Sequence, residues 1–276
     1  MADRFGRVAD AAVAGEAART LRGAWLDPAP ARPAPAPSAP AAADAGGRLS
    51  SLSFFCPAYH DEENLPALIP RVHAFLGRVA EVFEIIIVED GSPDGTGEVA
   101  DALARQYPEV RVIHHARNQG YGATLKEGFL AARHDYVMYT DGDNQYDVEE
   151  FEPFLPALAH ADVLCGYAVR KAVNLQRRAQ SLVYNLLVGA LFFSYFRDVN
   201  CSMKVLSRRA VQAIDLVSNS AFTDAEIVLR ARRAGLRIQR FPVTHYQRTK
   251  GVGSGSRPAV IAATVRDLLL FRLGRL

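Results

Sequence analysis

Short apolar runs alternate with amphipathic segments from residue 49 onward, and this alternation restricts the fold more than any other feature of the chain. The apolar runs are residues 52–58, 83–88, 110–115 and 136–141, and the segments with helical periodicity are residues 63–79, 97–107 and 120–133. Residues 162–167 form a further strand candidate. Strands and helices in strict succession favour a mostly parallel sheet. The chain is therefore predicted to fold as a Rossmann-type α/β domain, with its sheet flanked by helices.

The first 48 residues differ in composition from the rest of the chain. Residues 27–44 are almost wholly Ala and Pro, a composition that favours extended, solvated chain. We therefore predict a disordered tail over residues 1–48, an α/β domain over residues 49–257, and a helix over residues 258–276 that caps the domain or touches an anionic membrane. The amino end has no compact hydrophobic signal core, so export is not expected and the cytoplasm is the predicted location.

Net charge and cysteine usage exclude several classes of protein. A formal charge of +2 argues against a strongly basic surface for nucleic acid. Cys56, Cys165 and Cys201 are odd in number and far apart, which fits reduced thiols better than a disulfide framework or a metal site. Residues 182–196 are nearly free of charge but too short to cross a bilayer, which needs about 20 apolar residues, so a core helix is predicted there.

Two acids follow the fourth apolar run. Asp141 and Asp143 stand at its carboxyl end, separated by Gly142, which permits a tight bend. Ligands of α/β proteins bind at that edge of the sheet, and two carboxylates there can hold a hard divalent cation while leaving positions for diphosphate oxygens. An acidic turn without a ligand is the alternative, because Asp-x-Asp alone is a weak motif.

Polar residues also follow the first two apolar runs, at 57–64 and 89–96. Part of each cluster has a structural explanation, since residues 94–96 suit a turn with an N-cap and the acids at 61–63 suit the amino end of a helix. Asp90 has no such explanation. A carboxylate at the mouth of a parallel strand can accept hydrogen bonds from a nucleobase or a ribose, so a nucleotide site is predicted at this edge.

A dinucleotide-binding site is the competing interpretation. Gly120 and Gly122 open the third helical segment, and Asp141 follows about 20 residues later, as in the dehydrogenase fingerprint. Against this, Leu125 occupies the position of the third Gly, two strand and helix units precede the motif, and Asp143 has no ribose-binding task. The dehydrogenase interpretation is therefore the less favoured one.

Four motifs in order resemble those of family-2 glycosyltransferases with the GT-A fold: PAYHDEENLPALI, IIIVEDGSPDGT, RNQGYGATLKEG and TDGDNQYD. The resemblance covers about residues 50–250 and is greatest to polyprenyl-phosphate sugar transferases such as dolichyl-phosphate mannosyltransferase. Two positions depart from the family pattern. His60-Asp61 stands where Asn-Glu is common, and Glu89-Asp90 stands where two Asp are common, which leaves the nucleobase preference open.

The resemblance implies residues for binding the donor and its metal ion. The donor set is Pro57, Tyr59, Asp61, Asp90, Arg117, Asn118, Gly120, Gly122 and Asp141. The metal set is Asp141, Asp143, Gln145 and His245, with Mg²⁺ or Mn²⁺ as the ion. A nucleoside-diphosphate sugar is the donor that this family pattern implies.

For the acceptor side, the resemblance implies Arg177 and Arg178, whose cations could hold a phosphate, and Arg248 of a closing His-x-x-Arg motif before a Gly-rich loop. Asp224 and Glu226 stand where inverting transferases with hydroxyl acceptors place a general base. The alternative for these two acids is structural, because Thr223 suits an N-cap and acids suit the first turn of a helix. Both interpretations stay open.

Together these features predict a metal-dependent, inverting glycosyltransferase that moves a sugar from a nucleoside-diphosphate sugar to a polyprenyl phosphate. It would meet this lipid as a peripheral protein on the inner face of the membrane. A phosphate acceptor is already anionic, so it needs positioning more than deprotonation. The alternatives are transfer to a hydroxyl of a glycan or small molecule, and a non-catalytic nucleotide-binding or membrane-associated protein that retains the fold. No nucleic-acid partner is expected.

Overall fold

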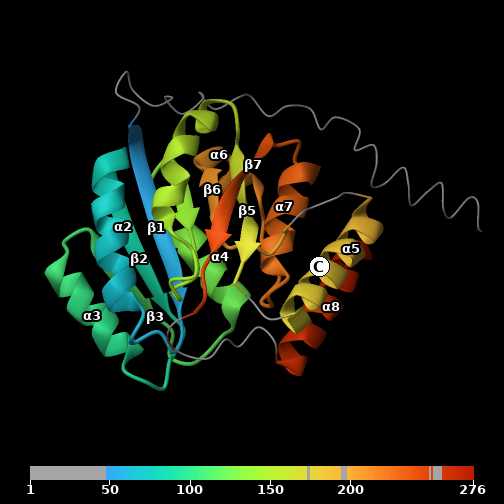
Figure 1. The fold of residues 1–276 in the computed structure, drawn as a ribbon, viewed down its shortest axis with the longest axis horizontal. Coiled ribbons are helices and arrows are strands. Elements are labelled where there is room, and N and C mark those ends of the chain that lie inside the picture. The colour runs from blue at the N-terminus through green and yellow to red at the C-terminus, as the bar shows by residue number, and fades with distance from the viewer. Residues whose placement is uncertain (1–47, 173–174, 194–197, 249, 251–256) are drawn as a thin grey trace, which may run out of the picture.

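A computed structural model of the chain describes residues 48–172, 175–193, 198–248, 250 and 257–276 (Figure 1). Its centre is a seven-stranded sheet with the order β3-β2-β1-β4-β6-β5-β7. The strands are β1 (Leu49–Ala58), β2 (Ala80–Glu89), β3 (Val110–His114), β4 (Tyr136–Tyr139), β5 (Val163–Lys171), β6 (Lys204–Ser207) and β7 (Ile238–His245). The helices are α2 (Leu65–Val79), α3 (Thr96–Gln106), α4 (Tyr121–Ala131), the 3₁₀ segment η1 (Val148–Ala159), α5 (Leu175–Phe192), α6 (Arg208–Ala213), α7 (Thr223–Arg233) and α8 (Pro258–Arg272).

Most neighbouring strands run parallel. β1 pairs in parallel with β2 and β4, β2 with β3, and β5 with β7, whereas β6 is antiparallel to both β4 and β5. The predicted mostly parallel α/β sheet is therefore confirmed. The antiparallel register places Lys204 of β6 directly opposite Tyr139 of β4, so these two side chains start from adjacent positions.

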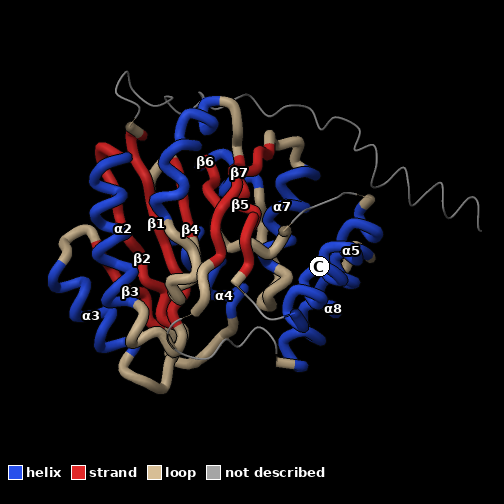
Figure 2. The backbone as a smooth tube through the Cα atoms, in the orientation of Figure 1, coloured by secondary structure: helices blue, strands red, loops and turns tan. Residues whose placement is uncertain are grey.

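Helices cover both faces of the sheet (Figure 2). α2, α3 and η1 pack on one face in a core that includes Phe54 and Phe151, and α4, α6 and α7 pack on the other in a core that includes Phe55 and Phe222. Successive residues of β1 alternate between the two cores, as Phe54 and Phe55 do. Because both faces are covered, the central strands are continuous apolar runs, which explains why they are readable in the sequence.

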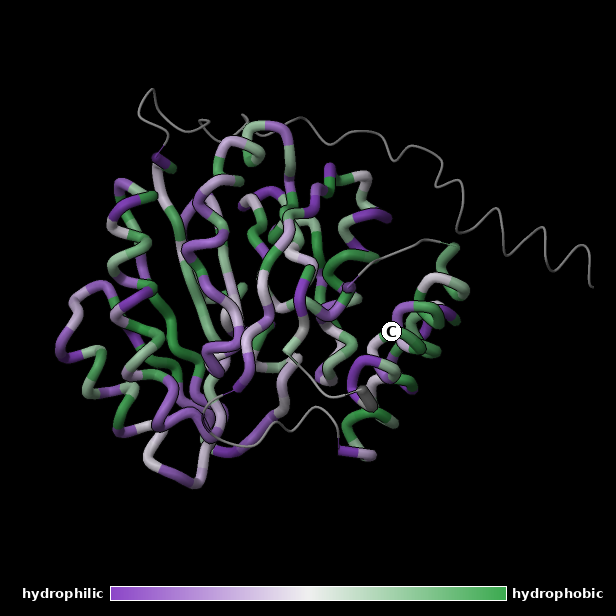
Figure 3. The backbone as a smooth tube through the Cα atoms, viewed as in Figure 1, coloured by the Kyte–Doolittle hydropathy of each residue, from purple (hydrophilic) through white to green (hydrophobic). Residues whose placement is uncertain are grey.

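α5 and α8 pack against each other at one end of the molecule, and hydrophobic residues lie along both helices (Figure 3). Val188 of α5 is buried, but Leu182 and Val183 are 61% and 65% exposed. The prediction of a core helix over residues 182–196 is therefore correct for one side of α5, where Val188 and Phe192 belong to the core, and wrong for the other. An apolar run shows that a helix has hydrophobic sides, but it does not show how many neighbours cover them. Residues 194–196 of that prediction lie outside the described part of the chain.

Two further predictions also fall outside the described residues: the disordered tail, apart from residue 48, and the Gly-rich loop at 251–256. The expected C-terminal helix corresponds to α8. Its Leu268 and Phe271 are buried in the core shared with α4 and α7, so one side of this helix packs against that core. Among the described helices, none is both long enough and apolar enough to cross a bilayer.

The turn after β4 that contains Asp141 and Asp143 is called the acidic turn. Glu84 of β2 is a buried acid at the opposite end of the sheet. Its carboxylate accepts hydrogen bonds from Ser53 Oγ at 2.7 Å, the Arg133 amide at 2.8 Å and Arg111 Nε at 3.0 Å. Burial opposes ionisation, but these donors outweigh it and hold the pKa of Glu84 below its usual value. The stability that Glu84 contributes is therefore present above its unfolded-state pKa of about 4.3 and is lost as the pH falls through the lower folded-state pKa.

In the Glu84→Gln variant we expect the free energy of unfolding to lose part of its dependence on pH in the acid range. Urea titrations over about pH 3–6 would measure this. The exposed Glu81 of the same strand provides the control, since Glu81→Gln removes the same charge without these hydrogen bonds. Equal acid sensitivity in the parent and in Glu84→Gln would contradict the prediction.

Candidate active site

The carboxyl ends of β1, β2 and β4 lie at one edge of the sheet, because these strands are adjacent and parallel. The segments that follow β1 and β4 are in close contact there. A Cβ atom on Gly142 would lie 2.7 Å from the Pro57 carbonyl oxygen and 3.3 Å from Asp61 Oδ2. The structure therefore brings the first and the fourth sequence motif together at a single site.

Asp61 is buried within this edge. Its Oδ2 accepts a hydrogen bond from the Tyr59 amide at 3.1 Å, and its Oδ1 accepts one from Asn64 Nδ2 at 2.8 Å. Burial raises the pKa of Asp61, and these two donors oppose the rise only in part. Asp61 thus shapes the turn that carries Tyr59, and contact of either side chain with a nucleoside stays a prediction.

Asp90 is also buried, and both oxygens of its carboxylate have hydrogen-bond partners within the protein. Oδ1 lies 2.7 Å from His115 Nδ1 and accepts a hydrogen bond from the Gln119 amide at 2.7 Å, and Oδ2 accepts one from the Gly120 amide at 2.9 Å. Asp90 therefore fixes the segment between β3 and α4. Two predicted donor residues of that segment are exposed: Arg117 and Asn118. Contact of Asp90 with a nucleobase stays a prediction.

Asp141 and Asp143 follow β4 and face the site from the acidic turn. The buried Asp143 forms an ion pair with Arg248 through Oδ2. Asp141 is partly exposed, and its Oδ1 accepts a hydrogen bond from Tyr121 Oη at 3.0 Å. The residue as a whole is partly exposed, but desolvation of its carboxyl group, followed by the negative charges of Asp143 and Asp224, raises the pKa of Asp141 to about 7. Carboxylates that oppose one another's ionisation in this way favour a bound cation.

These side chains fit a hard divalent cation. The carboxylate oxygens of Asp141 and Asp143 are the ligand type that Mg²⁺ and Mn²⁺ prefer. Gln145 Nε2 donates to the Tyr246 carbonyl at 3.0 Å, which leaves Gln145 Oε1 as the atom that could face an ion. Within the described residues, no three His, Cys, Asp or Glu side chains gather into a metal site, so His245 does not complete a preformed set with the two acids. Two carboxylates plus diphosphate oxygens match how such ions bind at nucleotide sites.

A third acid, Asp224, joins this site although it is distant in the sequence. Tyr121 Oη lies 3.0 Å from both Asp141 Oδ1 and Asp224 Oδ2. Asp224 Oδ1 accepts hydrogen bonds from Tyr139 Oη and from Lys204 Nζ, each at 2.6 Å. Lys204 is 1% exposed, so its charge is compensated inside the protein by Asp224. The donor side and the predicted acceptor side are thereby connected through Tyr121.

Glu226, predicted as a catalytic acid beside Asp224, has a different task. Its fully buried carboxylate accepts hydrogen bonds from the amides of Val217 and Ser218, each at 3.0 Å, and from Arg230 Nε at 2.7 Å. All of these donors belong to the loop before α7 or to α7 itself. The geometry therefore favours a structural role for Glu226 over the catalytic role that the sequence suggested.

Thr223 is not the N-cap that we predicted for α7. Phe222 holds the N-cap position, and no side chain there accepts a capping hydrogen bond. Thr223 Oγ1 instead donates to the carbonyls of Ser218 and Ser220, at 3.1 and 2.9 Å. An N-cap side chain accepts a hydrogen bond from one of the free amides in the first turn of the helix, whereas this hydroxyl donates to carbonyls of the preceding loop.

Of the two arginines predicted to bind the acceptor, Arg178 lines a pocket and Arg177 does not. Arg178 of α5 lines an open pocket together with Arg170 and His245, at the ends of β5 and β7. This pocket adjoins the acidic turn, because His245 forms an isolated β-bridge with Tyr146. Arg177 is half-buried and is not among the residues that line the described pocket.

The sequence motifs give no role to two residues of this site, Tyr121 and Tyr139. They include Lys204 only as the last residue of an Asp-x-x-Cys-x-x-Lys segment, residues 198–204, that resembles the family's border of the acceptor side. The sequence does carry a signal for Lys204, since a lysine in the apolar segment 203–206 can be buried only beside an anionic partner. No comparable signal marks Tyr121 or Tyr139, because tyrosine rings are common in protein cores and their hydroxyl partners lie on other elements.

The family model described as Glycosyl transferase family 2 matches residues 53–214, from β1 to the segment after α6. The chain belongs to this family. The match confirms the resemblance seen in the four motifs, and it identifies the protein as a glycosyltransferase. The dehydrogenase interpretation of Gly120 and Gly122 is therefore wrong.

Relatives in three microorganisms support the assignment to family 2. Glycosyltransferase AglD of Haloferax volcanii is 33% identical over 74% of this chain, and the chain spans 34% of the length of AglD. The polyprenol monophosphomannose synthase of Mycolicibacterium smegmatis is 31% identical over 74% of this chain and 82% of the relative. The undecaprenyl-phosphate mannosyltransferase of Micrococcus luteus is 28% identical over 76% of this chain and 89% of the relative.

Solved structures confirm the GT-A fold. Crystal structures of glucosyl-3-phosphoglycerate synthase from Mycobacterium tuberculosis cover 82% of this chain and 80% of their own. The complex with Mn²⁺, UDP and glucosyl-3-phosphoglycerate has a TM-score of 0.60 at 19% identity, and the complex with Mg²⁺ and UDP has a TM-score of 0.62 at 16% identity. At this level of identity the similarity concerns the architecture.

Proposed function

We propose that this glycosyltransferase moves a sugar, with inversion at the anomeric carbon, from a nucleoside-diphosphate sugar to a polyprenyl phosphate. The observation that carries the proposal is the pocket containing Arg170 and Arg178, which adjoins the turn with Asp141 and Asp143. Two guanidinium groups beside a diphosphate site are suited to a second, anionic substrate. The names of the Mycolicibacterium and Micrococcus relatives support a polyprenyl-phosphate acceptor.

Asp141 and Asp143 are proposed to hold a Mg²⁺ or Mn²⁺ ion together with the donor diphosphate. The Mycobacterium tuberculosis complexes with Mn²⁺ or Mg²⁺ and UDP support this assignment. When bound, such an ion offsets the charge that develops on the departing nucleoside diphosphate. Tyr121 orients Asp141 through its hydrogen bond, and Arg248 places a cation beside Asp143, where it can approach the same diphosphate.

The bonding of Asp224 bears on the kind of acceptor. Its carboxylate accepts hydrogen bonds from Tyr139 and Lys204 at once and lies 3.0 Å from Tyr121 Oη, which suits a group that holds the site together. A phosphate acceptor needs no more than this, because it is already anionic and has to be positioned. Transfer to a hydroxyl is the second candidate function. It is favoured by the nearness of Asp224 to Asp141, because Asp224 could there remove the proton from an acceptor hydroxyl.

The surface formed by α5 and α8 supports an approach to lipid. Leu182 and Val183 of α5 and Ile261 and Leu269 of α8 are exposed. Within Leu175–Phe192 of α5 and Pro258–Arg272 of α8, the one Asp or Glu is Asp267, which is buried. Exposed apolar side chains with neighbouring arginines and without exposed acids fit the interface of an anionic membrane. We propose that the protein meets its acceptor as a peripheral protein on the inner face of the membrane.

Release of nucleoside diphosphate tests the proposed function. The protein would be incubated with UDP- and GDP-sugars, Mn²⁺, and undecaprenyl phosphate in vesicles that contain anionic lipid. We expect one donor to yield nucleoside diphosphate and a lipid-linked sugar, and we expect EDTA to stop both. Turnover that needs neither the metal nor the lipid phosphate, or no turnover with any donor, would contradict the proposal.

Two variants distinguish the acceptor classes. For a phosphate acceptor, the double change Arg177→Ala and Arg178→Ala should raise the KM for the lipid and reduce transfer more than Asp224→Asn does. For a hydroxyl acceptor, Asp224→Asn should instead lower kcat by ~10²–10⁴-fold with binding preserved. Arg105→Ala, an exposed change on α3, serves as the control. An active double arginine variant beside an inactive Asp224→Asn enzyme would decide for the hydroxyl.

A further inference from the structure

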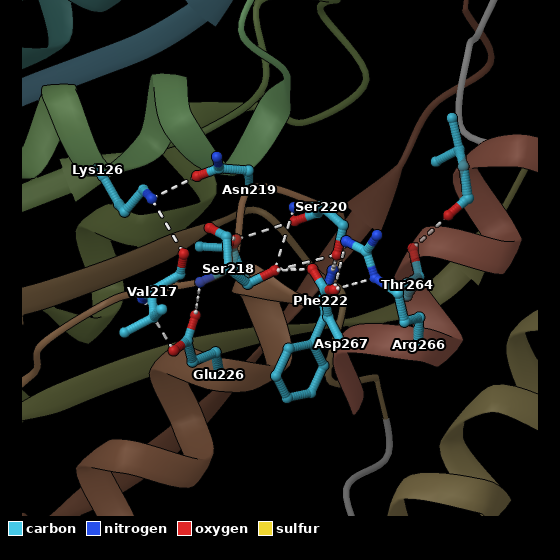
Figure 4. Close-up of polar contacts among 12 residues, drawn as sticks. Lys126, Val217, Ser218, Asn219, Ser220, Phe222, Glu226, Thr264, Arg266 and Asp267 are labelled. Carbon is cyan, nitrogen blue, oxygen red and sulfur yellow. Dashed lines mark hydrogen bonds and ion pairs between the residues drawn. The ribbon is translucent and has the colours of Figure 1, made fainter. Parts of the chain in front are cut away.

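The loop formed by residues 217–222 leads into α7 and contacts α4 and α8 as well (Figure 4). We call it the 217–222 loop. Towards α4, the Asn219 carbonyl accepts a hydrogen bond from the Gly122 amide at 3.0 Å, and the Val217 carbonyl accepts one from Lys126 Nζ at 3.1 Å. Lys126 Nζ also contacts Asn219 Oδ1. The loop therefore holds the first turns of α4, which begins with Tyr121.

The fit between this loop and α4 leaves no spare room. A Cβ atom on Gly122 would lie 2.3 Å from Thr223 Oγ1 and 2.5 Å from the Ser218 carbonyl oxygen. The first turn of α4 and the first turn of α7 thus touch through the loop. Tyr121 precedes this contact by one residue, and Asp224 follows it by one residue, so a shift of the loop changes the position of one relative to the other.

Helix α8 holds the same loop from the side opposite α4. Asp267 is 3% exposed, and its Oδ2 accepts a hydrogen bond from Ser218 Oγ at 2.8 Å. Ser218 Oγ in turn accepts one from the Ser220 amide at 3.1 Å. Phe271 packs against Phe222, with ring centroids 5.4 Å apart. A buried acid on an outlying helix is thus bonded to the segment that places Asp224.

We propose that Asp267 and Ser218 are positioning residues for the transfer reaction. Through the 217–222 loop, α8 fixes the placement of Asp224 on α7 relative to Tyr121 on α4, and hence relative to Asp141. This inference rests on the proposed function, because it assigns a purpose in catalysis to contacts that lie outside the site. Displacements of about 1 Å can cost ~10²-fold in rate, so a loosened loop is expected to act on turnover more than on binding.

The variants are chosen to separate positioning from stability. Asp267→Ala and Ser218→Ala break the contact, whereas Asp267→Asn keeps an oxygen that can accept from Ser218. Thr264→Val is the matched control: Thr264 lies one turn earlier in α8, is 7% exposed, and donates to the Val260 carbonyl at 2.7 Å within the same helix. It removes a buried hydroxyl without touching the loop.

Amide hydrogen exchange supplies a readout that needs no substrate. The Gly122 amide donates to Asn219, and the Glu226 amide donates to the Phe222 carbonyl at 2.8 Å. Both amides should exchange about tenfold faster in Asp267→Ala and in Ser218→Ala than in the parent, but not in Asp267→Asn or Thr264→Val. Unchanged exchange at these two amides in both alanine variants would overturn the proposal.

Steady-state kinetics test the consequence for the reaction, with the donor and lipid phosphate that the parent uses. We expect kcat to fall about tenfold in both alanine variants, with the donor KM changed by less than about twofold, and to recover in Asp267→Asn. The double alanine variant should fall by less than the product of the two single losses, because both changes remove the hydrogen bond between Ser218 and Asp267. If kcat in the two alanine variants fell only in proportion to the loss of melting temperature, as it does in the control Thr264→Val, the proposal would be overturned. If the parent releases nothing from any donor, the proposed function fails and the exchange experiment still decides whether α8 holds the site.

Discussion

The Asp143→Asn substitution is expected to lower metal-dependent transfer by at least ~10²-fold. Loss of even an outer partner of a metal ligand commonly costs ~10–100-fold, and Asp143 is proposed as a ligand itself. The asparagine keeps the shape of the side chain. Its oxygen can still accept the hydrogen bond that the Gln145 backbone amide donates to Asp143 Oδ1 at 3.1 Å in the parent protein. It loses the charge that attracts a divalent cation, and it also loses the ion pair with Arg248. The folded structure should therefore survive while the affinity for the ion falls.

The measurement is the Mn²⁺ dependence of nucleoside-diphosphate release, accompanied by the rise in melting temperature that Mn²⁺ and UDP together produce. We expect this rise in the parent and its loss in Asp143→Asn, because a ligand stabilises a protein only as far as it binds the folded state. Asp147→Asn is the matched control, since Asp147 lies in the same turn but pairs with Arg71 at 2.8 Å. Equal turnover of the parent and Asp143→Asn at limiting Mn²⁺ would show that Asp143 does not bind the ion.

The fold could be predicted because its signals are local. The apolar run at 52–58 lies within β1, the run at 83–88 within β2, and the run at 136–141 begins with β4. Strands that are covered on both faces need apolar side chains on both faces, so each is an uninterrupted run that is readable without knowledge of its neighbours. Once the strands are parallel, their carboxyl ends must meet at one edge, and this placed Pro57, Asp90 and Asp141 together.

The inner organisation of the site could not be predicted, because it depends on contacts between distant segments. Tyr121 and Asp224 are separated by 103 positions, and no local pattern reports that one phenol lies between two carboxylates. Lys204 reaches Asp224 from β6, whose antiparallel insertion between β4 and β5 is not visible in the succession of strands and helices. Glu226 and Asp224 look equivalent in sequence, and only packing shows that Glu226 is turned towards the 217–222 loop.

The same limit explains the incomplete prediction for α5 and the error on Thr223. An apolar run reports the character of a helix but not the number of elements packed around it, so exposure of Leu182 required the structure. A threonine at a helix start is a good candidate for a cap in the absence of competition. Here the 217–222 loop offers the Ser218 and Ser220 carbonyls, and the hydroxyl donates to them instead.

The Lys204→Met substitution is expected to lower the free energy of unfolding by about 3–5 kcal/mol, because it leaves the buried carboxylate of Asp224 without its counter-ion. For a folded region of this size, about 2–4 °C of melting temperature corresponds to each kcal/mol, so the loss should be roughly 10 °C. The methionine fills most of the space of the lysine stem, so the effect reports the charge rather than a cavity. Thermal melting of the two proteins measures it.

Two further variants show that the buried ion pair is responsible. Lys250→Met is the control for removal of a lysine, since Lys250 is exposed and lies 3.4 Å from Glu63, and an exposed pair contributes about 0–1 kcal/mol. The double variant Lys204→Met and Asp224→Asn removes both charges, so it should be more stable than Lys204→Met alone, as replacement of both partners of a buried pair commonly is. Restored stability without restored transfer would separate the contribution of Asp224 to the fold from its contribution to the reaction. A double variant that melts as low as, or lower than, Lys204→Met would mean that the loss comes from packing around Tyr139 and not from an uncompensated charge.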